Sequence, residues 1–241
     1  MTRARSVSGA PAFLFDLDGT LVDSVYQHVL AWRDALEEAG LPLAVWRIHR
    51  RIGMSGGLFV NALARETGRR LGAGEVARFQ QLHAEAFRRY AAQVRPLPGA
   101  VELLAHLAEE RVPHAIATSG YREGAQLSVK TLGIGPAVPL ITRDQVAHAK
   151  PDPDLFLAAA ERLGVPIDHS IVVGDSIWDL LAARRARALG VGLLSGGYGE
   201  EELERAGAYR VYQDPADLLA HLDEVGVRSG ERPLTGSTPE S

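Results

Sequence analysis

The stretch FLFDLDGTLVDS, at residues 13–24, joins a short apolar run to two aspartates and a Gly-Thr pair. An apolar run of this kind indicates a buried β-strand, here at 13–16. Asp16 and Asp18 then follow one residue apart. Asp-Gly is common turn chemistry, whereas two carboxylates at the end of a buried strand also suit a site that holds a cation. The remainder of the sequence decides between these two interpretations.

Short apolar runs and amphipathic helical patterns alternate from about residue 94 onward. The apolar runs predict further strands at 113–119, 138–142, 170–175, 190–195 and 208–212. Strands that are apolar on both faces and separated by helices are typical of a parallel sheet covered on two sides. We therefore predict an α/β fold, with a parallel sheet sandwiched by helices.

The segment between the first strand and residue 94 has helical patterns instead. Val25, Val29, Trp32, Leu36 and Ala39 fall on one stripe, Leu58, Ala62 and Leu63 on a second, and Val76, Phe79, Leu82, Ala86 and Tyr90 on a third. Ligands of open parallel sheets bind beyond the carboxyl ends of the strands, so an insert that emerges there is placed to act as a lid. We predict an inserted all-helical cap over 24–94.

The chain thus divides into two predicted units and two tails. The core comprises 10–23 and 95–227, and the cap comprises 24–94. The segments 1–9 and 228–241 are rich in small and polar residues, and such segments cannot bury enough apolar surface to offset the entropy of ordering them. We expect both tails to be disordered.

The composition excludes several classes of protein. Hydrophobic residues make up 46% and charged residues 23% of the chain, which is the balance of an ordinary globular protein. The net charge of -4 gives no sign of a face that binds nucleic acid. The absence of cysteine excludes disulfides and thiolate metal sites, and no apolar run approaches the ~20 residues that span a bilayer. We expect a cytoplasmic monomer or homodimer that binds neither nucleic acid nor membrane.

Polar side chains follow the predicted strands. Asp16 and Asp18 follow the first strand, Thr118 and Ser119 end the strand at 113–119, Lys150 follows the strand at 138–142, and Asp175 and Asp179 follow the strand at 170–175. Pro151 is expected to hold Lys150 in an extended segment. In a parallel sheet these strand ends share one edge, so we expect four carboxylates, the hydroxyls and one ammonium to converge there.

This set of groups predicts phosphoryl chemistry. Converging carboxylates repel one another and need a cation, and a set of oxygen ligands suits Mg²⁺. A magnesium ion that holds a phosphoryl oxygen neutralises its charge, and a carboxylate opposite the phosphorus can form an aspartyl-phosphate. The loop at Gly19 and Thr20 and the hydroxyl of Thr118, or of Ser119 in its place, can donate to phosphoryl oxygens, while Lys150 offsets their charge.

These segments resemble the four motifs of the haloacid dehalogenase-like phosphohydrolases. FDLDGTLVDS, the run that ends in Thr118, Lys150 ahead of PDPD, and GDSIWD stand in that family's order and rough spacing. The resemblance covers nearly the whole chain, from about residue 11 to 226. It implies a Rossmann-like sheet with a helical cap inserted after the first motif, in agreement with the pattern described above.

The resemblance also implies a role for each site residue. Asp16 would be the nucleophile and Asp18 the general acid and base, while Thr118 and Lys150 would bind the phosphoryl group. Magnesium would be held by Asp16, by the backbone carbonyl of Asp18 and by Asp175, with support from Asp179.

The first helix of the insert raises two further points. YQHVLAW resembles the hinge helix of the beta-phosphoglucomutase branch, so His28 is a candidate substrate-binding residue. The alternative is a helix histidine that packs beside Trp32. Ser24 is expected to cap this helix. We expect the residues that select the substrate to lie near His28 and in the loop at Ser55.

Several features distinguish among the branches of the family. The fourth motif carries Asp179 in the style of the phosphatases, and Gly56 and Gly57 stand where a mutase cap is expected to have a basic residue. Dehalogenases of the family replace the second aspartate, which is present here as Asp18. The sequence therefore predicts a magnesium-dependent phosphatase of a small phosphorylated metabolite, similar to the phosphoglycolate phosphatase branch. The alternatives are a phosphosugar mutase, a 2-haloacid dehalogenase and a non-catalytic protein that binds a phosphorylated ligand.

Overall fold

Six parallel strands form the central sheet, in the order β5-β4-β1-β6-β7-β8. The computed structural model describes residues 11–68 and 70–227, so the predicted tails at 1–9 and 228–241 lie outside the described residues. The strands are β1 (Ala12–Phe15), β4 (His114–Ala117), β5 (Leu140–Ile141), β6 (Ser170–Gly174), β7 (Leu189–Leu193) and β8 (Ala208–Tyr212). Each predicted strand is present, with its ends within two residues of the predicted ones.

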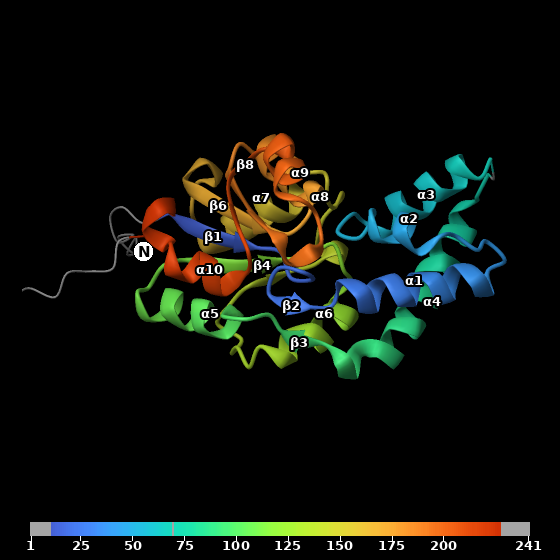
Figure 1. Ribbon diagram of the computed structural model, residues 1–241, viewed down its shortest axis with the longest axis horizontal. Helices are drawn as coiled ribbons and strands as arrows, with labels where there is room; N and C mark the ends of the chain where they lie inside the picture. Colours follow the sequence, from blue (N-terminus) through green and yellow to red (C-terminus); the bar gives the residue numbers. More distant parts are fainter. Residues whose placement is uncertain (1–10, 69, 228–241) are drawn as a thin grey trace, which may run out of the picture.

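Helices cover both faces of this sheet (Figure 1). Successive side chains of a strand point to opposite faces, so Phe13 and Phe15 of β1 face one layer and Leu14 faces the other. The first layer is α5 (Ala100–Glu109), α6 (Arg122–Thr131) and α10 (Pro215–Ala220), and the second is α7 (Asp154–Leu163), α8 (Ile177–Ala186) and α9 (Glu200–Ala206). Short 3-10 turns are η1 (Ala91–Gln93), η2 (Arg143–Gln145), η3 (Ile167–His169), η4 (Leu194–Gly196) and η5 (Leu222–Val225).

A helical cap is inserted between β1 and α5. The chain leaves and re-enters the core through an antiparallel pair, β2 (Val22–Asp23) and β3 (Arg95–Pro96). Between them lie α1 (Val25–Glu38), α2 (Val45–His49), α3 (Gly56–Glu66) and α4 (Ala73–Tyr90), which extend away from the sheet in Figure 1. The predicted fold class, a parallel sheet sandwiched by helices with an inserted helical cap, is confirmed. The domain boundaries at 23/24 and 94/95 stay a prediction.

The cap has an apolar core of its own, separate from the two core layers of the sheet. Trp32 of α1 and Phe59 of α3 pack in it with their ring centroids 4.3 Å apart. The helical pattern places Leu58 on the buried stripe of α3, and the structure corrects this. Leu58 is exposed, whereas Phe59 and Val60 are buried, because the buried face of α3 is the one that turns toward Trp32.

Hydrogen bonds between cap and core hold the cap against the carboxyl ends of the strands. Ser119 Oγ donates to the carbonyl of Gly53 at 3.0 Å, and the backbone N–H of Ser55 donates to the carbonyl of Lys150 at 3.2 Å. On the far side, His49 Nε2 donates to the carbonyl of Gly196 at 2.9 Å. The cap therefore closes over the edge of the sheet where the motif residues lie.

We expect Gly99→Ala to lower the free energy of unfolding more than Gly133→Ala. Both glycines have positive φ, 73° and 63°, so alanine strains both backbones by about 1 kcal/mol. At Gly99 a Cβ atom would also lie 2.4 Å from Cα of Ala216 in α10, whereas nothing lies within 4 Å at Gly133. Separation of α5 from α10 should cost a further ~1–3 kcal/mol. Urea unfolding measures both losses, and equal losses would contradict the close packing of α5 on α10.

Candidate active site

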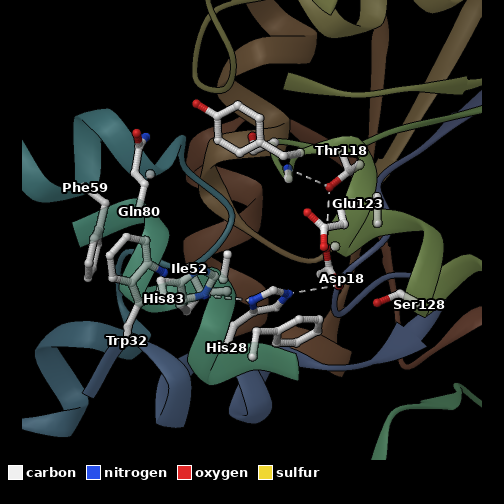
Figure 2. Close-up of a pocket in the computed structure, with 18 of the residues that line it drawn as sticks. Asp18, His28, Trp32, Ile52, Phe59, Gln80, His83, Thr118, Glu123 and Ser128 are labelled. Atoms are coloured by element: carbon white, nitrogen blue, oxygen red, sulfur yellow. Dashed lines mark hydrogen bonds and ion pairs between the residues drawn. The ribbon is translucent and has the colours of Figure 1, made fainter. Parts of the chain in front are cut away.

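A cavity of about 570 Å³ lies between the cap and the carboxyl edge of the sheet. Asp16, Asp18 and Thr118 line it on the core side, and Trp32 and Phe59 line it on the cap side. Figure 2 shows Asp18 and Thr118 on one side of the space and Trp32 and Phe59 on the other. A cleft that combines apolar walls with a few charged and polar groups has the usual form of a small-molecule site.

The loop of the cap at residues 53–56 borders this cavity. Gly53, Met54 and Gly56 line it. Ser55 does not: its hydroxyl instead accepts from the backbone N–H of Leu58 at 3.4 Å at the start of α3. The loop therefore borders the cavity, as the sequence predicts, but the side chain of Ser55 caps α3 and does not face the cavity.

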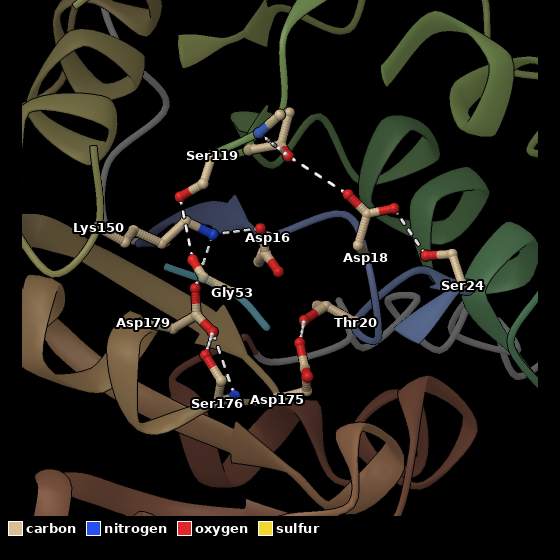
Figure 3. Close-up of polar contacts among 12 residues, drawn as sticks. Asp16, Asp18, Thr20, Ser24, Gly53, Ser119, Lys150, Asp175, Ser176 and Asp179 are labelled. Atoms are coloured by element: carbon tan, nitrogen blue, oxygen red, sulfur yellow. Dashed lines mark hydrogen bonds and ion pairs between the residues drawn. The ribbon is translucent and has the colours of Figure 1, made fainter. Parts of the chain in front are cut away.

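Three buried carboxylates meet at the sheet edge (Figure 3). Asp16 follows β1, Asp175 follows the neighbouring strand β6, and Asp179 lies in the first turn of α8. One oxygen from each carboxylate lies within 4.8 Å of the others, and all three residues are at most 3% exposed. The parallel pairing of β1 with β6 brings the first two together, as the sequence predicts.

Lys150 supplies positive charge within this cluster. Its Nζ donates to Oδ1 of Asp16 and, at 2.7 Å, to Oδ1 of Asp179. Burial acts to lower the pKa of Lys150, but the two carboxylates raise it by more than burial lowers it. The pKa of Lys150 is therefore above its ordinary value. The sequence predicts an extended segment here, whereas the structure has a turn with a cis Lys150–Pro151 peptide. Proline permits this isomer, which is typical of tight turns.

The carboxylates are in excess over this one ammonium. Burial raises the pKa of Asp16 to about 7; Lys150 lowers it, and the charges of Asp179 and Asp18 add to the rise. Burial, Asp179 and Asp16 also raise the pKa of Asp175 well above its ordinary value. A divalent cation bound among these oxygens would favour the ionised forms. The donor set, which is made of carboxylates in a buried pocket, therefore fits Mg²⁺.

Two further oxygens of the cluster accept hydrogen bonds from neighbouring residues. Asp179 Oδ2 accepts from the backbone N–H of Ser176 at 3.1 Å and from its Oγ at 2.5 Å. Asp175 Oδ1 accepts from Thr20 Oγ1 at 2.9 Å. These bonds fix the direction in which each carboxylate points.

The loop at Gly19 and Thr20 differs from the sequence expectation. The sequence predicts that this loop donates to a phosphoryl group, whereas in the structure the N–H of Gly19 donates to the carbonyl of Val22 and that of Thr20 to the carbonyl of Leu17. The hydroxyl of Thr20 donates to Asp175. Because Thr20 is fully buried, its N–H and hydroxyl donate to other groups of the protein. Gly19 serves instead by its size, because a Cβ atom there would lie 2.5 Å from Asp175 Oδ2.

Asp18 lies on the cap side of the cluster and has three partners. Its Oδ1 accepts from Ser24 Oγ at 2.6 Å and lies 3.2 Å from His28 Nε2, while Oδ2 accepts a long bond of 3.4 Å from Thr118 Oγ1. Burial acts to raise the pKa of Asp18, but His28 and the hydroxyl of Ser24 lower it more, so the net pKa is below its ordinary value.

The contact of Ser24 with Asp18 and the presence of His83 at this point are not predicted from the sequence. Ser24 was expected to cap α1, yet its side chain makes no cap hydrogen bond and donates to Asp18. Nε2 of His83, in α4, lies 3.2 Å from Nδ1 of His28. It is His83, not His28, that stacks on Trp32, with the two ring centroids 4.2 Å apart. Burial and His28 hold the pKa of His83 well below its ordinary value. No signal in the sequence pairs these two histidines, because they come from different helices.

The two hydroxyl residues after β4 take different positions. Thr118 is buried and its Oγ1 accepts from the N–H of Gly120 at 3.0 Å, which aims the hydroxyl at Asp18 and the cavity. Ser119 also lines the cavity, but its hydroxyl donates to the carbonyl of Gly53. Thr118 is thus the better placed of the two to meet a bound ligand.

Comparison with known proteins identifies the family of this chain. The family model described as haloacid dehalogenase-like hydrolase matches residues 10–187. The chain belongs to the haloacid dehalogenase-like hydrolases. The resemblance of its four motifs to that family is confirmed.

The relatives of this hydrolase include named phosphatases. It is 33% identical to phosphoglycolate phosphatase of Rhodospirillum rubrum over an alignment of 239 residues. This alignment covers 95% of this chain and 98% of that one. It is 34% identical to hexitol phosphatase A of Escherichia coli over an alignment of 166 residues. This alignment covers 68% of this chain and 74% of that one. The crystal structure of a hydrolase from Pseudomonas syringae matches with a TM-score of 0.88 and 56% identity, over 90% of this chain and 100% of that one.

We expect Lys150→Met to lower the free energy of unfolding by about 3–5 kcal/mol in metal-free buffer, because it leaves Asp16 and Asp179 buried without their cation. Lys130→Met is the matched control, since Lys130 is exposed on α6 and should change this free energy by less than ~0.5 kcal/mol. Urea unfolding followed by circular dichroism measures both variants. A loss at Lys150 no larger than the loss at Lys130 would show that the ammonium is not needed to hold these carboxylates together.

Proposed function

We propose that this haloacid dehalogenase-like hydrolase is a magnesium-dependent phosphatase that releases phosphate from a small phosphorylated metabolite. The observation that carries the proposal is the cluster of Asp16, Asp175 and Asp179 around Lys150, of which Asp16 lines a cavity large enough for a metabolite. The relatives named as phosphoglycolate phosphatase and hexitol phosphatase A support it.

Four oxygens of the site would hold the magnesium ion. They come from the carboxylates of Asp16 and Asp175, from the backbone carbonyl of Asp18 and from Asp179, which Lys150 and Ser176 already orient. A bound magnesium ion supplies charge neutralisation at the phosphoryl oxygens. Thr20 and Gly19 would serve this set by fixing Asp175.

The proposed reaction has two steps, each carried by residues of the core. In the first, an oxygen of Asp16 attacks phosphorus, the bond from phosphorus to the ester oxygen breaks, and Asp18 gives a proton to that oxygen. In the second, Asp18 takes a proton from a water molecule that attacks the aspartyl-phosphate, and phosphate leaves Asp16. Lys150 and the hydroxyl of Thr118 would hold the phosphoryl oxygens during both steps.

The partner of the site is, by this proposal, a phosphorylated small molecule. None of the helices among residues 11–68 and 70–227 combines the length and the apolar character needed to cross a membrane. A cytoplasmic location, a monomeric or homodimeric state and the lack of a nucleic-acid partner stay predictions.

We expect p-nitrophenyl phosphate to be hydrolysed with Mg²⁺ and not with excess EDTA. Asp16→Asn should lower kcat by at least about a thousandfold, because an amide oxygen is a poor nucleophile. Asp168→Asn, at an exposed position, is the matched control and should leave kcat within about twofold. Acid-quenched protein incubated with radiolabelled substrate should carry label at Asp16. Full activity of Asp16→Asn would contradict the assignment of the nucleophile.

One contact favours the phosphosugar mutase as a second candidate. His28 Nε2 lies 3.2 Å from Asp18, so the histidine of the helix that resembles the hinge helix of the beta-phosphoglucomutase branch lies at the site. Incubation with glucose 1-phosphate and a sugar bisphosphate primer distinguishes the two functions. A mutase gives isomerised sugar phosphate with little free phosphate, whereas a phosphatase releases phosphate without the primer.

We expect Gly196→Ala to raise the Mg²⁺ concentration for half-maximal activity by about 10–100-fold, the usual effect of disturbing a ligand's support. A Cβ atom at Gly196 would lie 1.8 Å from Asp175 Oδ2, so the carboxylate must move. Gly135→Ala is the control, since nothing lies within 4 Å of a Cβ atom there. Magnesium titration of the hydrolysis rate, with thermal unfolding to verify the fold, measures both variants. An unchanged magnesium dependence of Gly196→Ala would argue against Asp175 as a ligand.

A further inference from the structure

We infer that the substrate is a phosphate monoester whose leaving group is uncharged and has an apolar body the size of a ring, and that a short anionic leaving group such as glycolate is disfavoured. This inference rests on the proposed phosphatase function and concerns the part of the cavity that lies within the cap. That part is separate from the phosphoryl end, where Asp16, Asp18 and Thr118 lie.

The size of the cavity is the first observation. Its volume of about 570 Å³ lies in the range of sites that enclose whole drug-sized molecules. A two-carbon ester held at the phosphoryl end would fill only a small part of this volume, and water would remain against the apolar side chains in the rest of it. A larger leaving group that displaced this water would gain affinity from the hydrophobic effect.

The chemistry of the cap walls is the second observation. Trp32, Ile52, Met54, Phe59 and Phe87 all line the cavity, and Figure 2 shows Trp32, Ile52 and Phe59 around its cap end. Trp32 and Phe59 are 6% and 1% exposed, so packing in the cap core fixes their rings before a ligand binds. Rigid aromatic walls favour an apolar ligand and lose little side-chain entropy on binding.

The pairing of charges around the cavity is the third observation. Three arginines border it, and the side chains of two of them, Arg51 and Arg88, are in ion pairs. Arg51 pairs with Glu66, Arg88 donates to Glu123 at 2.8 Å, and the backbone N–H of Arg122 donates to Asp144 Oδ1 at 3.1 Å. At Arg51 or Arg88 a carboxylate on the leaving group would therefore compete with an existing ion pair, and throughout the cavity it would approach Asp18, Glu123 and Asp144, which also line it.

One polar side chain on the cap wall shows what the leaving group can carry. Gln80 of α4 lines the cavity, and its amide has no hydrogen-bond partner within the described part of the chain. Figure 2 places it beside Trp32 and Phe59. A hydroxyl or carbonyl group on the apolar body would satisfy this amide without introducing charge.

The test compares three alkyl phosphates in the presence of Mg²⁺: ethyl phosphate, cyclohexylethyl phosphate and phosphoglycolate. All three have an alkyl leaving oxygen, so differences in kcat/KM report mainly on the contacts of the leaving group. We expect kcat/KM for cyclohexylethyl phosphate to exceed each of the others at least tenfold. Equal values, or a preference for phosphoglycolate, would overturn the inference. If none of the three nor p-nitrophenyl phosphate is hydrolysed, the proposed phosphatase function itself fails.

Two adjacent glycines provide a matched pair of variants. A Cβ atom at Gly56 would lie 3.4 Å from Trp32 Cζ2 and from Gln80 Nε2, in the cavity wall, whereas Gly57 does not line this cavity and a Cβ atom there would meet only Gln80 Nε2, at an ordinary contact distance of 3.6 Å. Gly56→Leu should lower kcat/KM for cyclohexylethyl phosphate at least tenfold and leave that for ethyl phosphate within threefold. Gly57→Leu should leave both within threefold.

Thermal unfolding of each variant verifies that it folds, and Gly56→Ala serves as a smaller change if leucine is not tolerated. Gly56→Ala should lower kcat/KM for the ring ester about threefold and leave that for ethyl phosphate unchanged. Equal losses for the two esters in folded Gly56 variants, or a loss in Gly57→Leu as large as that in Gly56→Leu, would overturn the placement of the leaving group against the cap.

Discussion

The buried ion pairs of Lys150 hold together the edge of the sheet on which the site is built. Nζ of Lys150 donates to Asp16 after β1 and to Asp179 in α8, and all three side chains are withdrawn from water. Charges at this depth are tolerated only when they are paired, so the loop that carries Lys150 and the first turn of α8 must keep their places. Asp175 leaves the cluster with an excess of negative charge, which suits it to a divalent cation.

Core and cap contribute different chemistry to the same cavity. The core provides carboxylates, an ammonium and a hydroxyl, because each of these follows a parallel strand. The cap provides aromatic and aliphatic surface from helices that pack on one another. Asp18 lies where the two meet: it accepts from Ser24 at the entrance to α1 and lies beside His28 within that helix. A change in cap position therefore alters the surroundings of Asp18 as well as the walls of the cavity.

The fold and the order of the motifs could be predicted because their signals are local. Each strand is a short apolar run, and polar residues placed after parallel strands must share an edge, which explains why Asp16, Asp175 and Lys150 were predicted to converge. The errors came where local rules compete with packing. Ser24 occupies a helix start but donates to Asp18, and Leu58 fits a helical stripe but is exposed beside the buried Phe59.

The amino-acid sequence is enough to specify the α/β class, the inserted helical cap, the family and the carboxylates of the site, since periodicity and chain order determine all of these. It does not specify which groups each side chain meets. His28 and His83 are 55 residues apart, and the donors of Gly19 and Thr20 find acceptors within the protein. Periodicity shows that a helix face is buried but not what it is buried against, so the walls of the cavity and their apolar character arise from the packing of the cap on the core.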